Sequence, residues 1–175
     1  LFKVKVSFMF CRCNMIIDIS HAVEGEFYTI EETLTLNNSM LGSREGRFTA
    51  PATIKGWYTV MDDNVAMNFE IKANAVFNCD SCLSPAYIDF KIPVSETFFK
   101  EKVDVDSLVY EDEQIDLMPV INERIVLAVP SRVLCKNDCK GLCDRCGQNY
   151  NEGTCNCNVN NRENDNNPFA VLKKI

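Results

Sequence analysis

Six cysteines lie close together near the C-terminal end of this sequence, in the order C-x3-C-x3-C-x2-C-x8-C-x-C. A separate C-x2-C pair lies further upstream, between two strand-like segments. Thiolates are ligands that Zn²⁺ prefers, and a short C-x2-C turn lets two sulfurs converge on one ion. Eight cysteines divide into two complete four-sulfur sets. We therefore predict one zinc site at Cys79, Cys82, Cys135 and Cys139, and a second at Cys143, Cys146, Cys155 and Cys157.

The second set has the more favourable local sequence. Gly147 follows its C-x2-C turn, and glycine adopts the positive φ that a tight turn requires. Cys155 and Cys157 are two residues apart, so both sulfurs of an extended segment point to one side. We expect two zinc ions per chain, and a single ion held by four of the last six cysteines is the alternative. Four-sulfur sites are closed, which makes them structural rather than catalytic.

A redox function for Cys79 and Cys82 is the rival interpretation. In thioredoxin-like proteins a C-x2-C motif opens a helix after a strand, and the helix N-terminus lowers the thiol pKa. Here a strand is expected on both sides, which favours metal, although Leu83 stands where a glycine would suit the turn. The sequence has one histidine, His21, and no phosphate-binding loop or nucleophile elbow. We therefore predict that the protein is not an enzyme and takes no small-molecule substrate.

Length and composition fit a chain that folds around one core. It has 175 residues, 46% of them hydrophobic, and ten cysteines, a lower density than in small disulfide-rich proteins. No apolar run approaches the roughly 20 residues of a membrane span, and no signal peptide of the usual pattern is visible. We expect a reducing, cytoplasmic setting without membrane association, where clustered cysteines indicate metal or redox chemistry.

Charge is distributed unevenly along the chain. Residues 15–129 carry 8 Lys and Arg against 20 Asp and Glu, whereas residues 130–175 carry 7 against 5. An acidic body disfavours broad, salt-dependent binding of nucleic acid. The candidates for contact with RNA or a partner are therefore the cations around the cysteines: Arg132, Lys136, Lys140 and Arg145. The competing interpretation is that these cations offset the negative charge of zinc bound by four thiolates.

Alternating hydrophobicity predicts an antiparallel sheet with one buried face. The apolar positions recur every second residue from Phe48 to Val60, from Val65 to Phe77 and from Ile88 to Val94. Helical spacing predicts one helix near 116–129, with Asp116 as its N-cap, and residues 100–114 read as an acidic loop. The expected fold class is α+β: an antiparallel meander or small, partly open barrel, with one packing helix and a C-terminal cysteine-rich zinc module.

The sequence also predicts how the chain is divided. Residues 1–14 are apolar and basic, unlike the rest of the chain, and we expect them to be a non-native extension with Met15 as the true start. A genuine N-terminal strand or a degenerate export signal is the competing interpretation. The expected parts are a β domain over 15–134, the zinc module over 135–157, a flexible linker over 158–167 and a terminal docking segment over 168–175.

Several motifs resemble those of one known family. They are MIIDIS at Met15, CDSCL at Cys79, the helix running into LAVP at Pro130, the cysteine block, and NPFAVL near the C-terminus. Together they span residues 15–175 and resemble the YceD-like proteins, the large ribosomal RNA subunit accumulation family, in their Gram-positive form. The terminal motif comprises Asn167, Pro168, Phe169, Ala170, Val171 and Leu172.

The resemblance implies a cytosolic, non-enzymatic role in accumulation of large-subunit ribosomal RNA, and hence in ribosome biogenesis. The implied partners are pre-ribosomal large-subunit RNA, a ribosomal or assembly protein, or both. A protein-interaction adaptor that acts on RNA only indirectly is the remaining alternative. Of the site residues, only the cysteine motif and the NPFAVL motif carry over from the family.

Overall fold

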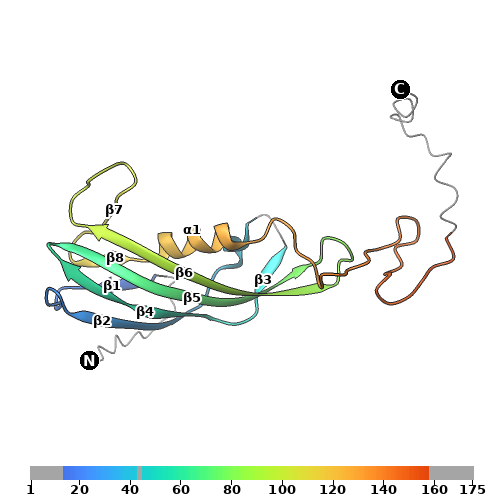
Figure 1. The fold of residues 1–175 in the computed structure, drawn as a ribbon, viewed down its shortest axis with the longest axis horizontal. Coiled ribbons are helices and arrows are strands. Elements are labelled where there is room, and N and C mark those ends of the chain that lie inside the picture. The colour runs from blue at the N-terminus through green and yellow to red at the C-terminus, as the bar shows by residue number, and fades with distance from the viewer. Residues whose placement is uncertain (1–13, 43–44, 158–175) are drawn as a thin grey trace, which may run out of the picture.

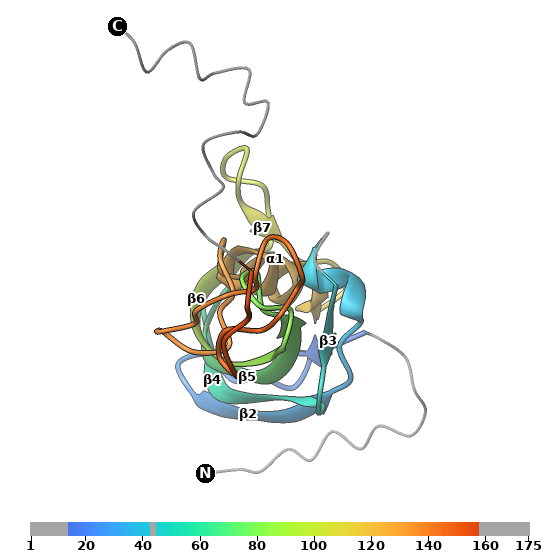
Figure 2. The same cartoon turned by 90° about the vertical axis from the view of Figure 1, so that its right-hand side faces the viewer.

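A single twisted sheet dominates the computed structural model, which describes residues 14–42 and 45–157 (Figure 1). Its hydrogen-bonded order is β2-β4-β5-β6-β7, with β3 also paired to β5. The main strands are β2 (Phe27–Leu34), β4 (Ala52–Met61), β5 (Asn64–Asn78) and β6 (Pro85–Phe99). β2 and β7 are the two edges, so the sheet curls without closing into a barrel (Figure 2). The expected α+β class with an open sheet is confirmed. Its strands pair antiparallel as predicted, except for the short β7, which is parallel to β6.

β5 is the central strand, and its composition explains its place. Every second residue is apolar and at most 2% exposed, and these are Val65, Met67, Phe69, Ile71, Ala73, Ala75 and Phe77. This alternation puts one face of the strand in the core, as predicted. β6 follows the predicted alternation, because Ile88, Phe90, Ile92 and Val94 all face the core, but only every fourth residue from Ala86 to Phe98 is fully buried, while Ile88 and Ile92 are half-buried. Glu96 also faces inward there and pairs with Arg124.

The predicted strand over residues 48–60 is wrong in its continuity. The structure divides it into β3 (Gly46–Phe48) and β4, and both pair with β5. Pro51 lies in the gap between the two pieces, where it has no backbone N–H to donate to a neighbouring strand. Thr49 stays attached through its backbone N–H, which donates to the carbonyl oxygen of Asn74 at 2.9 Å.

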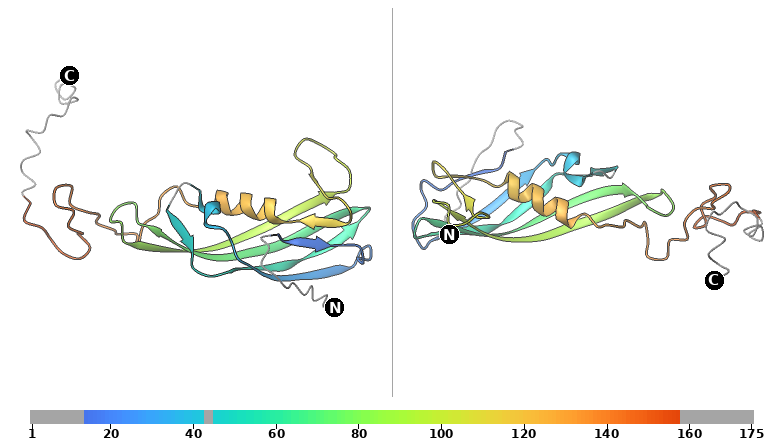
Figure 3. Two further views of the ribbon diagram at one scale, coloured as in Figure 1. Left: turned by 180° about the vertical axis from the view of Figure 1, so that it is seen from behind. Right: turned by 90° about the horizontal axis from the view of Figure 1, so that it is seen from above.

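One helix and a small second sheet cover the inner face of the large sheet (Figure 3). Helix α1 (Met118–Ala128) buries Val120, Ile121 and Ile125 and contacts β6 and the 3-10 helix η1 (Asn38–Leu41). β1 (Ile16–Asp18) pairs with β8 (Gln114–Asp116) beside it. None of the helices in the described ranges has the length and apolarity needed to cross a bilayer.

The segment before the helix corrects two expectations. Residues 100–114 are not one loop, because β7 (Leu108–Val109) runs parallel to β6 and β8 begins at Gln114. The N-cap position belongs to Leu117, which is fully buried, rather than to Asp116. Asp116 still contributes locally, since its Oδ1 accepts a hydrogen bond from the Met118 backbone N–H at 2.9 Å.

Other expectations lie outside the described residues. They concern the extension up to residue 13, the linker from residue 158 and the terminal docking segment with its NPFAVL motif. The first described residues, by contrast, are tied to the core: Met15 is 5% exposed and its carbonyl oxygen accepts from the Leu117 N–H at 2.8 Å.

Gly56 offers a test of this packing. A Cβ at this position would lie 2.2 Å from the Asn68 carbonyl oxygen and 2.4 Å from the Phe69 Cα, both on the paired strand β5. Gly56→Ala must push β4 and β5 apart, so we expect it to lower the free energy of unfolding by about 1–3 kcal/mol in denaturant titrations. Gly153→Ala is the matched control, because its nearest neighbour is a flexible side chain at 3.9 Å. Equal stability of the two variants would contradict this packing.

Candidate metal centres

The turn between β5 and β6 presents the first C-x2-C pair. The Cys79 N–H donates to the carbonyl oxygen of Ser84 at 2.9 Å, and the Leu83 N–H donates back to the carbonyl of Cys79 at 2.9 Å. These two bonds fold Cys79 to Ser84 into a tight knuckle at the end of the hairpin. Leu83 adopts φ +61° to complete it. A left-handed conformation costs a non-glycine residue roughly 1–2 kcal/mol.

The second C-x2-C pair forms the same knuckle. The Cys143 N–H donates to the Gln148 carbonyl at 2.8 Å, and the Gly147 N–H donates to the Cys143 carbonyl at 3.0 Å. Gly147 has φ +72°, so it occupies the place that Leu83 holds in the first turn. The glycine expected from the sequence is in the conformation that the turn requires. The leucine, expected to suit the turn less well, adopts it too.

Four sulfurs converge at the first knuckle. The thiol sulfurs of Cys79, Cys82, Cys135 and Cys139 all lie within 4.8 Å of one another. Two of the separations are 3.8 Å, between Cys79 and Cys139, and 3.5 Å, between Cys82 and Cys135. A tetrahedral zinc with Zn–S bonds near 2.3 Å has sulfur–sulfur edges of about 3.8 Å. The donor set and its spacing therefore fit one zinc ion without rearrangement of the backbone.

The chain returns to the first knuckle through a short backbone pairing. Asp80 donates its N–H to the Val133 carbonyl at 2.8 Å, and Val133 donates its N–H to the Asp80 Oδ2 at 2.7 Å. Val133 is 1% exposed, which anchors the segment after α1 against the core. Two residues later, the sulfur of Cys135 therefore lies beside those of Cys79 and Cys82 in the hairpin turn.

The second group is built from the end of the described chain. The sulfurs of Cys143, Cys146, Cys155 and Cys157 also lie within 4.8 Å of one another. Cys143 is buried, Cys146 is exposed, and the other two are half-buried. The structure thus gathers the eight cysteines into the same two sets that the sequence predicts, and all eight are free thiols. Cys11 and Cys13 lie outside the described residues.

Two asparagines connect the groups, and sequence reasoning missed both. Asn151 donates from Nδ2 to the sulfur of Cys139 at 3.4 Å, and its Oδ1 accepts from the Lys140 N–H at 3.0 Å. Asn149 donates from Nδ2 to the Ser84 hydroxyl of the first knuckle at 3.2 Å. An isolated asparagine in a polar stretch has no spacing that marks such a role, so the sequence held no sign of it.

Hydrogen bonds to sulfur favour ionisation in the first group. Burial opposes ionisation of Cys79, but the backbone N–H groups of Ser81, Cys135 and Cys82 together lower its pKa to about 6. Asn151 and the Gly141 N–H lower the pKa of Cys139. Cys135 behaves oppositely, because its hydrogen bond with the Cys82 thiol and its partial burial raise its pKa to about 12.

The second group also combines a thiol of lowered pKa with a thiol of raised pKa. The Tyr150 hydroxyl and the N–H groups of Cys146 and Arg145 lower the pKa of Cys143 to about 6. The Tyr150 hydroxyl also lies 3.7 Å from the Cys155 sulfur. The interaction of Cys157 with Cys146, together with burial, raises the Cys157 pKa to about 12. One thiol in each group is thus more readily ionised than a free cysteine, and a divalent metal would displace the protons of the others.

The four predicted contact cations are all exposed around these groups. Arg132 donates to the Ser81 hydroxyl at 3.3 Å, and Lys136 lies 3.9 Å from the Asp138 carboxylate. Lys140 and Arg145 have no ion-pair partner in the part of the chain that the structure describes. The remaining candidate, His21, is exposed on the β1–β2 connection, in neither sulfur group.

The part of the chain that carries both sulfur groups is shared with known proteins. The profile of the family described as "Large ribosomal RNA subunit accumulation protein YceD" matches residues 67–175, which include all eight of these cysteines. The chain is 25% identical over 122 residues to the uncharacterized protein YlbN of Bacillus subtilis (strain 168), covering 67% of this chain and 71% of that protein. No solved structure matches the chain.

Two further relatives are matched over shorter stretches. An uncharacterized protein of Mycobacterium tuberculosis (strain ATCC 25618 / H37Rv) is 30% identical over 94 residues, which cover 50% of this chain and 45% of that protein. The chloroplastic YCED homolog 1 of Arabidopsis thaliana, named as a large ribosomal RNA subunit accumulation protein, is 28% identical over 64 residues, 37% of this chain and 20% of that protein. With most of its length matched by the family profile, the chain belongs to the YceD family.

Proposed function

We propose that this protein is a non-enzymatic, cytoplasmic factor in ribosome biogenesis that supports accumulation of large-subunit ribosomal RNA. The observation that carries the proposal is the family match, which spans all eight cysteines of the two sulfur groups and bears that description. The Arabidopsis relative is also named as a large ribosomal RNA subunit accumulation protein. Partners of this role are pre-ribosomal large-subunit RNA, a ribosomal or assembly protein, or both.

Structural zinc, two ions per chain, completes the proposal. Each group supplies four sulfur ligands that lie within 4.8 Å of one another. Four ligands complete the tetrahedral coordination of a zinc ion and leave no coordination position open for a substrate. Among the described residues after Val133, only Cys143 is buried, so the cysteine-rich segment has almost no apolar core of its own. Metal affinity is the remaining source of folding free energy for such a small segment.

In this role, zinc fixes the fold of the segment that carries four exposed basic side chains. Arg132, Lys136, Lys140 and Arg145 are exposed on the segment that the two groups fold, where they are available to RNA phosphates or to a partner. A zinc ion with four thiolates carries a net charge of −2, so part of this positive charge offsets the sites themselves. The acidic body makes an indirect, protein-mediated action on RNA the main rival within the same role.

A thiol–disulfide oxidoreductase that uses Cys79 and Cys82 is the second candidate. The lowered pKa of Cys79 favours it, since a reactive thiol needs thiolate character. Its burial argues against it: Cys79 is 0% and Cys82 4% exposed, and both sulfurs face those of Cys135 and Cys139. A metal ion held there leaves neither thiol free for exchange with a substrate.

Metal content provides the first test. Protein purified under reducing conditions without chelator is expected to contain two zinc ions per chain by elemental analysis. Cys143→Ser should retain one ion and lose hydrogen-exchange protection over residues 140–157, while the strands of the sheet stay protected. Asn156→Ser, a change between two ligands at an exposed position, should retain both ions. A single ion in the unaltered protein together with disulfide reductase activity would instead support the oxidoreductase.

Tyr150 provides a test of how the second group is tuned. Tyr150→Phe removes the hydroxyl that contacts the sulfurs of Cys143 and Cys155 and keeps the ring. Loss of a hydrogen bond to a ligand typically weakens metal binding by 10–100-fold, and we expect about tenfold at the second group alone, measured by chelator competition. Tyr87→Phe, at a 76% exposed position on the sheet, is the control and should bind as the unaltered protein does. Unchanged affinity in Tyr150→Phe would show that the hydroxyl is not coupled to the metal.

Ribosomal RNA levels test the cellular role. Deletion of the gene in the native host is expected to lower large-subunit relative to small-subunit ribosomal RNA. The unaltered chain and Asn156→Ser should restore the ratio, whereas Cys143→Ser should not. An unchanged ratio in the deletion strain would contradict the proposed role. Ultraviolet crosslinking in cells then separates direct RNA contact through residues 132–145 from action through a protein partner.

A further inference from the structure

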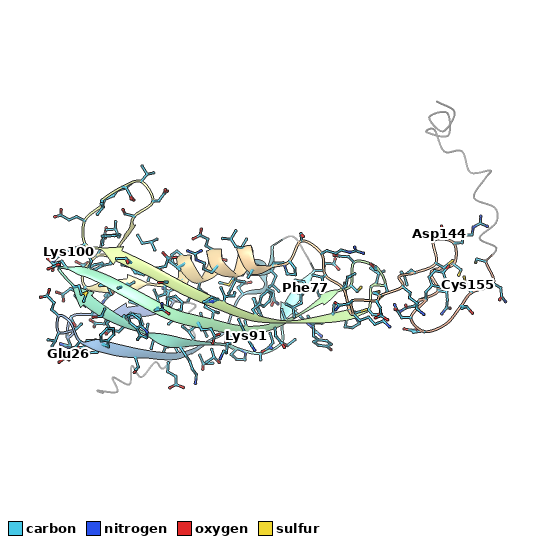
Figure 4. The ribbon with its side chains drawn as sticks, in the orientation of Figure 1. Glu26, Phe77, Lys91, Lys100, Asp144 and Cys155 are labelled. Atoms are coloured by element: carbon cyan, nitrogen blue, oxygen red, sulfur yellow. The ribbon has the colours of Figure 1, made fainter. Side chains whose placement is uncertain are left out.

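Three large apolar side chains are exposed together on the outer face of the sheet. Phe27 of β2 is 63% exposed, and Trp57 and Met61 of β4 are 39% and 54% exposed. We refer to these three residues as the distal patch, because they lie at the end of the sheet away from the cysteines. Figure 4 shows this separation, with Glu26 labelled at one end of the molecule and Cys155 at the other.

Strand register makes the patch continuous. Phe27 is paired directly opposite Thr59, so Trp57 and Met61 are its two diagonal neighbours on the same face. The rings of Phe27 and Trp57 are in edge-to-face contact, with centroids 5.0 Å apart and an interplanar angle of 71°. Single exposed apolar residues are ordinary on a protein surface, but adjoining ones mark an interaction site.

The burial of Thr59 shows that the apolar side chains of the patch exclude water from the surface beneath them. It lies on the outer face between Phe27 and Ala66 in the strand register, yet it is only 3% exposed. Its hydroxyl is buried and has no hydrogen-bond partner among the described residues. A polar side chain excluded from water on the outward side of a sheet indicates that its apolar neighbours pack tightly over it.

Carboxylates lie at the hairpin end of the patch. Glu24 reaches the turn beside Met61, where its Oε1 accepts from the Asp62 N–H at 3.0 Å. Within the described ranges, Glu24, Glu26 and Asp62 have no ion-pair partner, whereas the neighbouring Asp63 pairs with Lys100 at 3.2 Å. The excursion from Lys100 to Gln114 is at the same end of the molecule but at the opposite edge of the sheet from β2 (Figure 4). It adds six carboxylates and Lys102 to that end: Glu101, Asp104, Asp106, Glu111, Asp112 and Glu113.

We propose that the distal patch binds a cationic, partly apolar segment of another protein. The aromatic pair and Met61 supply the apolar contact, and the adjacent carboxylates of Glu24, Glu26 and Asp62 select lysine and arginine over neutral or acidic segments. The same charges disfavour the other occupants. Phosphates of a nucleic acid would meet uncompensated carboxylates, and a second copy of this chain would bring like charges together.

The distal patch shares no residue with the sulfur groups, and its proposed role does not depend on the proposed function. The centre of the patch is paired with Ala66, and β5 runs from there to Asn78, so at about 3.3 Å per residue the patch and the first knuckle are roughly 40 Å apart. A protein segment at one end therefore leaves the cationic end free for a different partner. Failure of the patch to bind would leave the metal and ribosomal RNA predictions unaffected.

Trp57 is the single tryptophan of the chain, so its fluorescence reports on the patch directly. The probe is a synthetic 12-residue peptide of alternating lysine and leucine, which contributes no fluorescence of its own. We expect a blue shift of the Trp57 emission on titration and weaker binding as salt increases. Phe27→Ser and Met61→Ser should each weaken binding at least tenfold. Glu24→Gln, which keeps an oxygen to accept from Asp62, should weaken it several-fold.

Tyr87→Ser is the matched control, because Tyr87 is also exposed on the outer face but pairs with Val76 near the cysteine end. It should bind the peptide as tightly as the unaltered chain. Circular dichroism establishes that each variant is folded. An emission shift with oligouridylate but not with the peptide would overturn the proposal in favour of nucleic acid. A shift that depends on protein concentration alone would overturn it in favour of self-association, and no shift with any probe would also refute it.

Discussion

β5 and β6 are paired in continuous antiparallel register from Val65 opposite Phe98 to Asn78 opposite Pro85. Both ends of the molecule depend on that pairing. At one end the register brings Asn78 and Pro85 together, so the six residues between them must turn as a knuckle and present two sulfurs to the same side. At the other end β4 turns into β5 at Asp62 and Asp63. The pairing of these two strands places Met61 and Trp57 on the outer face. A shift of one residue would reverse every side chain of β5 and disrupt both surfaces.

Local patterns explain what could be read from the sequence. β5 alternates apolar and polar residues without interruption because one of its faces is in the core along its whole length. The cysteine sets were readable for a similar reason, since the eight residues form four pairs that are close in sequence, and four pairs divide into two sets of four sulfurs. The two groups of four sulfurs therefore match the prediction in membership, and the metal they would hold remains a prediction.

Contacts between distant segments explain what could not be read. β1 pairs with β8 across nearly a hundred residues, and neither three-residue strand has a pattern strong enough to predict it. The wider burial spacing of β6 arises because α1 covers only part of that strand and because Glu96 faces inward to Arg124. Asn149 and Asn151 acquire their roles only once the first knuckle is beside them. The family resemblance added a cellular role, but it assigned no function to these residues.

The two sulfur groups differ in the length of chain that each one closes. Cys82 and Cys135, whose sulfurs are 3.5 Å apart, lie 53 positions apart along a chain segment that includes β6 and α1. The four cysteines of the second group lie within one short segment. Cross-linking a long loop removes more conformational entropy from the unfolded chain than cross-linking a short one. An ion in the first group would therefore stabilise the chain from Cys79 to Cys139, including β6 and α1, whereas an ion in the second would stabilise only its own short segment.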